Sequence, residues 1–323
     1  MTLTNTPRVS VIMPAYNADR FVRSALLSVM AQSYQDYEVI VVDDGSTDDT
    51  KASALAVAGP IRYMFQSNQG PAAARNSGIH AARGEFICFL DADDLWLTDK
   101  LSTQVQFMDS NPDVGLVFAD EEEFDERGVH SRSLLARSPF HKELLPGSLI
   151  RDGFRKLLEE NFIPTSTVLI RRTCLDAVVE LFDPTLRTAE DRDLWSRIAV
   201  RFPIAVISRV LARKRMVPSS VSSNVESTMR SRIQWLQKAR VLFPDLATPP
   251  TVNRLLSPTY LQLGFVLLHQ SKAREARQAG IRALRVSRSP SQWSMAVLLI
   301  VCTLLGTQAT DAIFRVKRLL WSM

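Results

Sequence analysis

The chain has 323 residues, 46% of them hydrophobic and 23% charged, which excludes a disordered and a fibrous protein. Its three cysteines form no C-x-x-C pair, and its four histidines lack zinc-ligand spacing, so a disulfide framework and a zinc site are not expected. Residues 1–200 carry a net charge of −10 and residues 201–323 a net charge of +15. This asymmetry predicts two regions with different partners.

Apolar runs and amphipathic segments alternate through the first 118 residues. The run at 39–42 is β-branched throughout, which is typical of a central parallel strand covered on both faces. Ser46 or Thr47 is expected to cap the helix that follows it. The expected strands are 9–13, 39–42, 61–65, 86–90 and 114–118, and the expected helices are 19–31, 51–57, 71–84 and 98–109. This rhythm predicts an α/β fold with a mostly parallel sheet flanked by helices.

The pattern loosens after residue 118. The acidic stretch 120–126 is interpreted as a solvated loop. The elements expected beyond it are helices at 151–160 and 190–201 and strands at 165–170, 204–207 and 210–216. Composition changes after Pro218, and prolines at 249–250 and 290 interrupt an Arg-rich helical region. We therefore expect one domain at 1–218 and a basic helical C-terminal region at 219–323.

Polar groups directly follow four of the predicted strands. Because ligands of an open α/β sheet bind outside the carboxyl ends of its strands, these groups are expected to form one site. The four segments are Pro14-Ala15-Tyr16-Asn17, Asp43-Asp44-Gly45-Ser46-Thr47-Asp48, Asn68-Gln69-Gly70 and Asp91-Ala92-Asp93-Asp94.

The acidic segment 91–94 comes directly after the apolar strand 86–90. Ionised carboxylates near a packed edge are costly unless they are paired or coordinated, and Mg²⁺ or Mn²⁺ takes carboxylate and phosphate oxygens. The alternative is helix capping, in which Asp93 or Asp94 caps the next helix. Its position beside three other polar strand ends favours a metal site.

The segment 43–48 has a similar pair of interpretations. A turn with a helix cap accounts for Gly45 and Ser46 but not for two adjacent aspartates, and Asp44 can accept hydrogen bonds from a base or a ribose. No G-x-x-x-x-G-K-[ST] loop occurs, and no G-x-G-x-x-G follows the first strand, which disfavours a P-loop protein and a dinucleotide-binding fold.

The chain contains four segments in this order: Val9 to Asn17, Val41 to Asp48, Gly70 to Asn76 and Leu90 to Asp94. Together they resemble the family 2 glycosyltransferases of the GT-A fold, and the resemblance covers roughly residues 7–215. It implies a nucleotide-diphospho-sugar donor, with UDP favoured, and Mn²⁺ or Mg²⁺ as cofactor.

The resemblance also assigns roles to single residues. Pro14, Ala15, Tyr16 and Asn17 would line the nucleotide pocket, Asp44 would contact the base, and Arg75 would lie near the nucleotide. In the D-x-D motif, Asp93 would bind the metal and Asp91 would lie closer to the ribose, with Asp94 as a further candidate.

Members of this family place a catalytic carboxylate at an E-D step shortly before a Trp. Here that step is Glu190-Asp191, with Trp195 four residues on. Asp191 would be the general base that takes the proton of the acceptor hydroxyl, and a single displacement would invert the anomeric carbon. The alternative is a charged first helical turn, and Trp195 is interpreted as a core residue that could also flank an acceptor sugar.

The C-terminal region lies outside the resemblance. Arginines between 271 and 288 make it cationic, but no recognition motif supports nucleic acid as its partner. The apolar stretch 295–305 is too short to span a bilayer, and no signal peptide is expected at the N-terminus. The stretch 295–305 and the apolar and basic residues that follow it up to Trp321 are typical of a helix on an anionic membrane surface. The alternative is a helical hairpin packed on itself or on a partner chain.

The leading hypothesis is an inverting glycosyltransferase acting on a glycan or lipid-linked acceptor in cell-surface polysaccharide assembly. We expect it in the cytoplasm, peripheral at the inner face of the cytoplasmic membrane. A nucleotidyltransferase would need a Gly-rich basic loop after the first strand, which 14–17 does not offer. A non-catalytic sugar-nucleotide-binding or scaffold protein would have lost the D-x-D or the base, and both are present. The sequence does not decide the oligomeric state.

Overall fold

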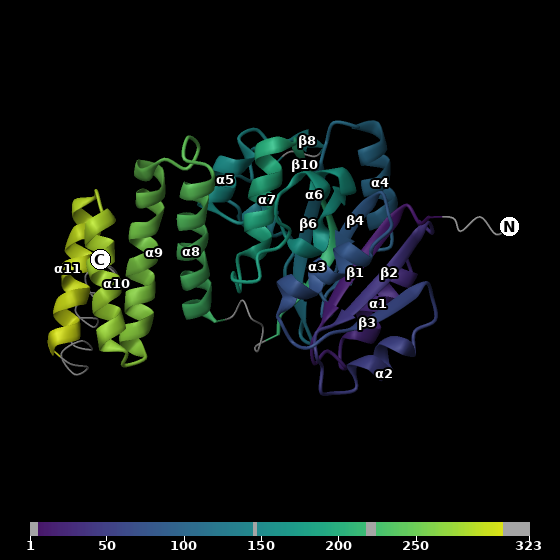
Figure 1. The fold of residues 1–323 in the computed structure, drawn as a ribbon, viewed down its shortest axis with the longest axis horizontal. Coiled ribbons are helices and arrows are strands. Elements are labelled where there is room, and N and C mark those ends of the chain that lie inside the picture. The colour runs from purple at the N-terminus through teal and green to yellow at the C-terminus, as the bar shows by residue number, and fades with distance from the viewer. Residues whose placement is uncertain (1–5, 145–146, 218–223, 306–323) are drawn as a thin grey trace. The chain divides into compact units, whose positions relative to one another are not determined.

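The computed structural model describes residues 6–144, 147–217 and 224–305 (Figure 1). The chain divides into two compact units, one reaching residue 219 without 187–189, the other comprising 187–189 and the residues from 220. The boundary predicted near Pro218 falls within 218–223, outside the described residues.

The first unit is built on one sheet in which ten described strands take part. Its main path runs β3-β2-β1-β4-β9-β6-β10-β5, with β7 beside β6 and β8 beside β10. The strands are β1 Val9–Ala15, β2 Tyr37–Asp43, β3 Ile61–Phe65, β4 Phe86–Phe89, β5 Leu95–Trp96, β6 Leu116–Asp125, β7 Gly128–Ser131, β8 Ser148–Leu149, β9 Leu169–Arg171 and β10 Ile204–Arg215.

Most of these strands share one direction. The strands β3, β2, β1 and β4 are mutually parallel, β9 lies antiparallel between β4 and β6, and β10 is parallel to β6. The carboxyl ends of β1, β2, β4, β6 and β10 therefore meet at one edge of the sheet. The mostly parallel sheet predicted from the sequence is confirmed.

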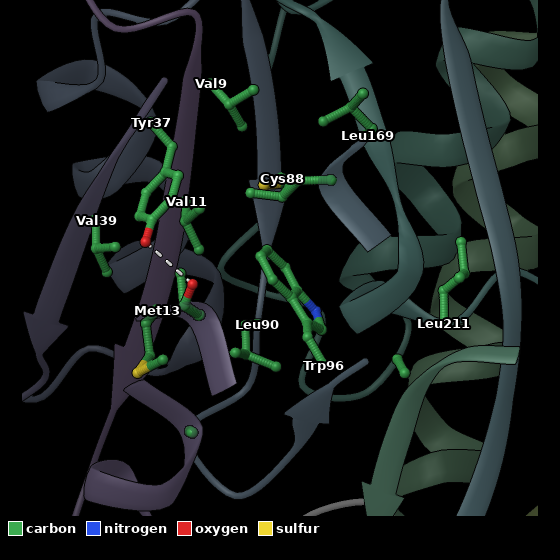
Figure 2. Close-up of a cluster of buried hydrophobic side chains, with 14 of the residues drawn as sticks. Val9, Val11, Met13, Tyr37, Val39, Cys88, Leu90, Trp96, Leu169 and Leu211 are labelled. Atoms are coloured by element: carbon green, nitrogen blue, oxygen red, sulfur yellow. Dashed lines mark hydrogen bonds between the residues drawn. The ribbon is translucent and has the colours of Figure 1, made fainter. Parts of the chain in front are cut away.

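Helices cover both faces of this sheet. Along β1, Val9, Val11 and Met13 belong to one apolar cluster (Figure 2). Ile12 belongs to the other, as the two-residue period of a strand requires. The first cluster contains residues of α1 Val22–Met30, α2 Thr50–Leu55 and α4 Lys100–Ser110. The second contains residues of α3 Pro71–Ala81, α5 Gly153–Glu159, α6 Arg172–Ala177 and α7 Glu190–Arg201.

The acidic stretch after residue 118 does not form the predicted loop. It continues β6, where Asp120 is 6% exposed and Glu121 2% exposed. The neighbouring β10 explains this, because Arg213 lies opposite Glu122 and its Nε pairs with the Glu122 carboxylate at 2.5 Å. Cross-strand pairing thus holds charges that composition alone assigns to solvent.

Two other expectations about strands are also corrected. The predicted strands at 204–207 and 210–216 are one strand, β10, interrupted by register shifts between Ile207 and Ala212. The predicted strand 165–170 begins as a 3₁₀ turn, Thr165–Thr167, before β9. A second 3₁₀ turn spans Leu135–Arg137, and the short strands β5, β7 and β8 were not predicted.

The part of the second unit described from residue 224 onward is helical. Its helices are α8 Val225–Leu242, α9 Pro249–His269, α10 Ala273–Val286 and α11 Pro290–Leu305. The prolines that predicted breaks open α9 and α11, where a missing N–H costs no helical hydrogen bond. Helix α9 packs against α8, α10 and α11 (Figure 1). None of the helices in the described part is both long and apolar enough to cross a membrane. Residues 306–323, which hold the end of the predicted membrane segment, lie outside the described residues.

Helix α3 approaches β1 more closely than a side chain allows. A Cβ added to Gly78 would lie 2.4 Å from Cγ2 of Ile12, a fully buried β-branched residue that has little freedom to move. We therefore expect Gly78→Ala to lower the free energy of unfolding by about 1–3 kcal/mol, although alanine is the better helix former.

Urea unfolding monitored by circular dichroism measures this change. His80→Ala, at an exposed position of the same helix, is the matched control and should stay within about 0.5 kcal/mol of the parent. A Gly78→Ala variant as stable as the parent would contradict the close approach of α3 to β1.

Candidate functional site

The ends of β1 and β2 are joined by the side chain of Asn17. Its Oδ1 accepts from the backbone N–H of Thr47 at 2.9 Å, and its own N–H donates to Ser46 Oγ at 2.9 Å. Ser46 and Thr47 therefore contact Asn17 and do not cap α2, which starts at Thr50 beside the Asp48 carboxylate. Pro14 and Ala15 are buried in β1, whereas Tyr16 is 53% exposed.

Asp44 connects the end of β2 to the start of α3. Its carboxylate accepts from Gln66 Nε2 at 2.7 Å, from the Gln69 N–H at 3.0 Å and from the Gly70 N–H at 2.7 Å. Gly70 has φ of 90°, a conformation that suits glycine, and Pro71 begins the helix directly after it. Asp44 thereby fixes the loop from which α3 starts.

The D-x-D segment lies at the carboxyl end of β4. Asp91 and Asp93 are partly exposed, whereas Asp94 is buried and accepts from Ser166 Oγ at 2.7 Å and from the Arg215 N–H at 3.0 Å. Arg215 Nε also donates to the carbonyl of Asp93 at 3.0 Å. The end of β10 therefore holds this loop in place.

The carboxylates at this edge are close enough to raise each other's pKa. Burial, and then the charge of Asp91, raise the pKa of Asp93 to about 6. Burial, and then Asp93 and Asp91, raise the pKa of Asp94 well above its usual value. Burial raises the pKa of Glu121 to about 7, although Lys214 opposes it. Buried or partly buried carboxylates thus lie close together at this edge.

Such a cluster of carboxylates fits a divalent cation. No group of three or more His, Cys, Asp or Glu side chains within the described ranges forms a complete metal site. Mg²⁺ is usually held by one or two carboxylates together with substrate phosphates, and Mn²⁺ also suits carboxylate oxygens. The partly exposed carboxylates of Asp91 and Asp93 fit that donor set.

Arg75 lies between the two acidic motifs. It is 5% exposed, and its Nη2 donates to Asp91 Oδ1 at 2.7 Å while its Nη1 donates to Glu190 Oε1 at 2.8 Å. Its guanidinium also lies 5.5 Å from the ring of Phe182. Although burial disfavours the charge, Asp91 and Glu190 keep the pKa of Arg75 above its ordinary value.

Glu190 and Asp191 begin α7 but face different surroundings. Burial, and then the charge of Asp191, raise the pKa of Glu190 to about 7, with Arg75 opposing. Asp191 is partly exposed, and its Oδ2 accepts from Asn161 Nδ2 at 3.0 Å and from Thr165 Oγ1 at 3.1 Å. One acid is therefore held inside the unit, while its neighbour is accessible to solvent.

Trp195 lies one turn further along α7 and is fully buried. Its ring packs against Phe89 of β4 and against Phe182. It is a core residue through which α7 packs against the sheet.

The structure thus brings several of the predicted residues together. Arg75 contacts Asp91 and Glu190 directly, and Asp93, Asp94 and Asp191 are their sequence neighbours. Sequence reasoning missed Asn161, Thr165, Ser166, Glu121 and Arg215, which hold or surround these acids. Among these, only the charge of Glu121 gave a signal, and it was assigned to a loop.

Comparison with known proteins identifies the family of the chain. The model of glycosyl transferase family 2 matches residues 10–178. An uncharacterized glycosyltransferase of Rickettsia conorii is 33% identical over 66% of this chain and 33% of its own length. The Escherichia coli glucosyltransferase WfgD, named for UDP-Glc and a GlcNAc-diphosphoundecaprenol acceptor, is 31% identical over 70% of this chain and 83% of its own. The chain spans about a third of the first three curated relatives and just under two thirds of the next two.

Two solved structures share the fold. Staphylococcus aureus TarS 1–349 with UDP-GlcNAc has a TM-score of 0.59 at 19% identity, over 86% of this chain and 91% of its own. The Pyrobaculum calidifontis mannosyltransferase PcManGT with GDP-Man and Mn²⁺ has a TM-score of 0.59 at 21% identity, over 99% and 84%.

The buried pair of Arg75 and Glu190 makes stability depend on pH once the arginine is removed. In Arg75→Met the buried Glu190 carboxylate loses its cation, so its pKa should rise further above that in the unfolded chain. A carboxyl group whose pKa is higher in the folded chain lowers the free energy of unfolding as pH rises from its unfolded pKa through its folded pKa. We expect a loss of about 3–5 kcal/mol at pH 8 and a smaller loss at pH 5.

Urea unfolding at the two pH values tests this expectation. Arg209→Met removes a surface pair with Asp99, in which the arginine is 57% exposed, and should cost less than about 1 kcal/mol at both pH values. An equal loss at pH 5 and pH 8 in Arg75→Met would show that Glu190 is not the group left unpaired.

Proposed function

Since the chain belongs to glycosyl transferase family 2, we propose that it is an inverting glycosyltransferase. It moves a sugar from a nucleotide-diphospho-sugar to a hydroxyl of a glycan or lipid-linked acceptor. The observation that carries this proposal is the buried Arg75 that joins Asp91 of the D-x-D to Glu190, the neighbour of Asp191. The arginine thus connects the proposed donor-binding motif to the start of the helix that carries the candidate base. Residues 1–218 would form the GT-A catalytic domain.

The nucleotide of the donor is assigned to the ends of β1 and β2. Pro14, Ala15, Tyr16 and Asn17 line the pocket, with Asp44 toward the base and Arg75 behind the diphosphate end. The names of WfgD and of the TarS complex contain UDP-sugars, which supports UDP, whereas PcManGT was solved with GDP-Man. We therefore propose a UDP-sugar as the donor.

Asp93 is the proposed metal ligand, with Asp91 beside it and the buried Asp94 holding the loop. The raised pKa of Asp93 and the nearby charge of Asp91 favour a bound cation at this position. When bound, Mn²⁺ or Mg²⁺ neutralises negative charge on the departing diphosphate. The protein itself supplies the rigid loop that keeps these two carboxylates at the edge of the sheet.

Asp191 is the proposed general base. Its carboxylate takes the proton of the acceptor hydroxyl while that oxygen attacks the anomeric carbon. The bond from that carbon to the diphosphate oxygen breaks in the same displacement, which inverts the configuration. Glu190 does not compete for this role, because it is buried and paired with Arg75.

The acceptor is proposed to be a glycan or a lipid-linked sugar used in cell-surface polysaccharide assembly. Two relatives support this choice by name. WfgD is named for a diphosphoundecaprenol-linked acceptor, and TuaG of Bacillus subtilis, 33% identical over 68% of this chain, is named as a putative teichuronic acid biosynthesis glycosyltransferase.

A peripheral position on the cytoplasmic face of the cytoplasmic membrane is proposed from the helical unit. Residues 224–305 carry eleven basic and three acidic side chains. Arg282, Arg285 and Arg288 are exposed at the end of α10. Helix α11 contains no charged residue and exposes Trp293 and Leu304, which are 56% and 64% accessible. A helical unit with both exposed basic and exposed apolar side chains suits an anionic lipid surface.

Substitution of the base should separate rate from binding. We expect Asp191→Asn to lower the turnover of a saturating donor by about 10²–10⁴-fold, because the shape is kept and proton acceptance is lost. Affinity for UDP, measured by calorimetry, should stay within about twofold. Asp93→Ala should instead lose the Mn²⁺-dependent part of UDP binding.

A thermal-shift screen with Mn²⁺ and each nucleotide-sugar identifies the donor for these assays, and slow transfer to water reports turnover. A ligand at about 100 times its Kd adds about 2.7 kcal/mol of stability. Asp176→Asn, an exposed acid on α6, is the matched control and should keep the parental rate. Parental turnover by Asp191→Asn would remove this residue from the mechanism.

Vesicle co-sedimentation tests the membrane proposal. The full chain should bind anionic vesicles at low salt and less at high salt, since exposed basic residues contribute roughly 1 kcal/mol each near anionic lipid and are screened by ions. The triple variant Arg282→Gln, Arg285→Gln, Arg288→Gln should bind more weakly. A triple variant of Arg127, Arg132 and Arg151, which are exposed in the other unit, makes the same charge change and should bind as the parent does. Equal binding by both triple variants would place the lipid contact elsewhere.

A further inference from the structure

The 3₁₀ turn Thr165–Thr167 lies between the two acidic motifs and contacts both. Thr165 Oγ1 donates to Asp191 Oδ2 at 3.1 Å. The next residue, Ser166, donates through Oγ to Asp94 Oδ2 at 2.7 Å, and the same oxygen accepts from the Asp91 N–H at 3.3 Å. Two adjacent hydroxyls therefore face two different parts of the site.

This turn is itself fixed from beneath by buried side chains of β5 and α4. Trp96 Nε1 donates to the Ser166 carbonyl at 2.7 Å, and Gln104 Nε2 donates to the Thr167 carbonyl at 2.7 Å. Lys100 Nζ donates to Gln104 Oε1 at 2.6 Å and lies 4.1 Å from the centre of the Trp96 ring. Buried hydrogen bonds from Trp96 and Gln104 therefore hold the backbone carbonyls of the turn.

We propose that this turn sets the position of the candidate base relative to the donor-binding loop, and that Thr165 is the positioning residue for Asp191. The proposal rests on the proposed function, in which Asp191 is the base. Thr165 does not touch substrate in this proposal and acts only through the carboxylate.

The hydrogen bonds of Asp191 explain how Thr165 would orient it. Oδ2 accepts from both Thr165 and Asn161, while Oδ1 accepts from the Arg192 N–H at 2.6 Å. Both oxygens are thus held, which fixes the carboxylate plane and leaves Oδ1 with a free direction for the acceptor proton. Asn161 is exposed, so Thr165 is the better fixed of the two side-chain donors.

The test compares two substitutions at Thr165 with a matched threonine elsewhere. Thr165→Val keeps the size of the side chain and removes its hydroxyl, whereas Thr165→Ser keeps the hydroxyl. Thr185→Val removes a similar hydrogen bond, from Thr185 Oγ1 to Asp183 at 2.7 Å, at an exposed position outside the site. All three are full-length proteins assayed with the donor found by the screen.

We expect Thr165→Val to lower kcat about tenfold with the donor KM within twofold, because a misplaced base slows the chemical step without weakening donor binding.

Ser166→Ala should give the complementary result, since its hydroxyl faces Asp91 and Asp94. Its main effect should be weaker UDP binding with Mn²⁺, measured by calorimetry. Thr165→Ser should recover most of the lost kcat, and Thr185→Val should match the parent.

The outcomes separate this proposal from the one on which it rests. If Asp191→Asn is inactive but Thr165→Val keeps the parental kcat, the positioning role is wrong and the base stands. If Asp191→Asn keeps parental turnover, the proposed function has failed instead. A Thr165→Ser variant as slow as Thr165→Val would also overturn the proposal, because the hydroxyl would then not be the group that matters.

Discussion

The buried charge of Arg75 is the constraint on which the rest of the site depends. A guanidinium that is 5% exposed must be paired, and its two carboxylate partners come from the end of β4 and the start of α7. Arg75 reaches these partners because α3 begins at the loop held by Asp44 and packs directly against β1 at Gly78. Elements far apart in the sequence are thus fixed by one ion-pair network, and breaking it would leave two acids unpaired.

Further along the D-x-D loop, the carboxylates lack such a close arginine partner among the described residues. Arg75 compensates Asp91 and Glu190, but Asp93, Asp94 and Glu121 have raised pKa values because burial and like charges outweigh Lys214 and Arg215. In the proposed function, a divalent cation held by Asp91 and Asp93 would supply positive charge at this edge.

Local sequence patterns predicted the elements whose faces are apolar on a regular period, including β3 at 61–65 and α7 at 190–201, which the structure reproduces. They also predicted which strand ends carry polar groups, because parallel strands all end at one edge. They were wrong where a partner strand decides the outcome. The acids at 120–125 form a strand because Arg213 and Lys214 of β10 lie beside them, and nothing within that stretch reveals this. The hydroxyls of Thr165 and Ser166 likewise could not be assigned to the site, because their hydrogen-bond partners, Asp191 and Asp94, are distant in sequence.

The same contrast explains why the chemistry is easier to infer than the sugar. The groups proposed to carry the reaction are held by contacts that demand particular residue types: a carboxylate for Arg75, a glycine at a φ of 90°, a hydroxyl for Asp94. Groups such as Tyr16 and Asn161 are exposed and have few such demands placed on them by the fold. A pocket that selects one sugar over another does so through side chains of this second kind, by shape and by single hydrogen bonds. Motifs built from the first kind therefore identify the reaction while leaving donor choice to residues that folding does not constrain.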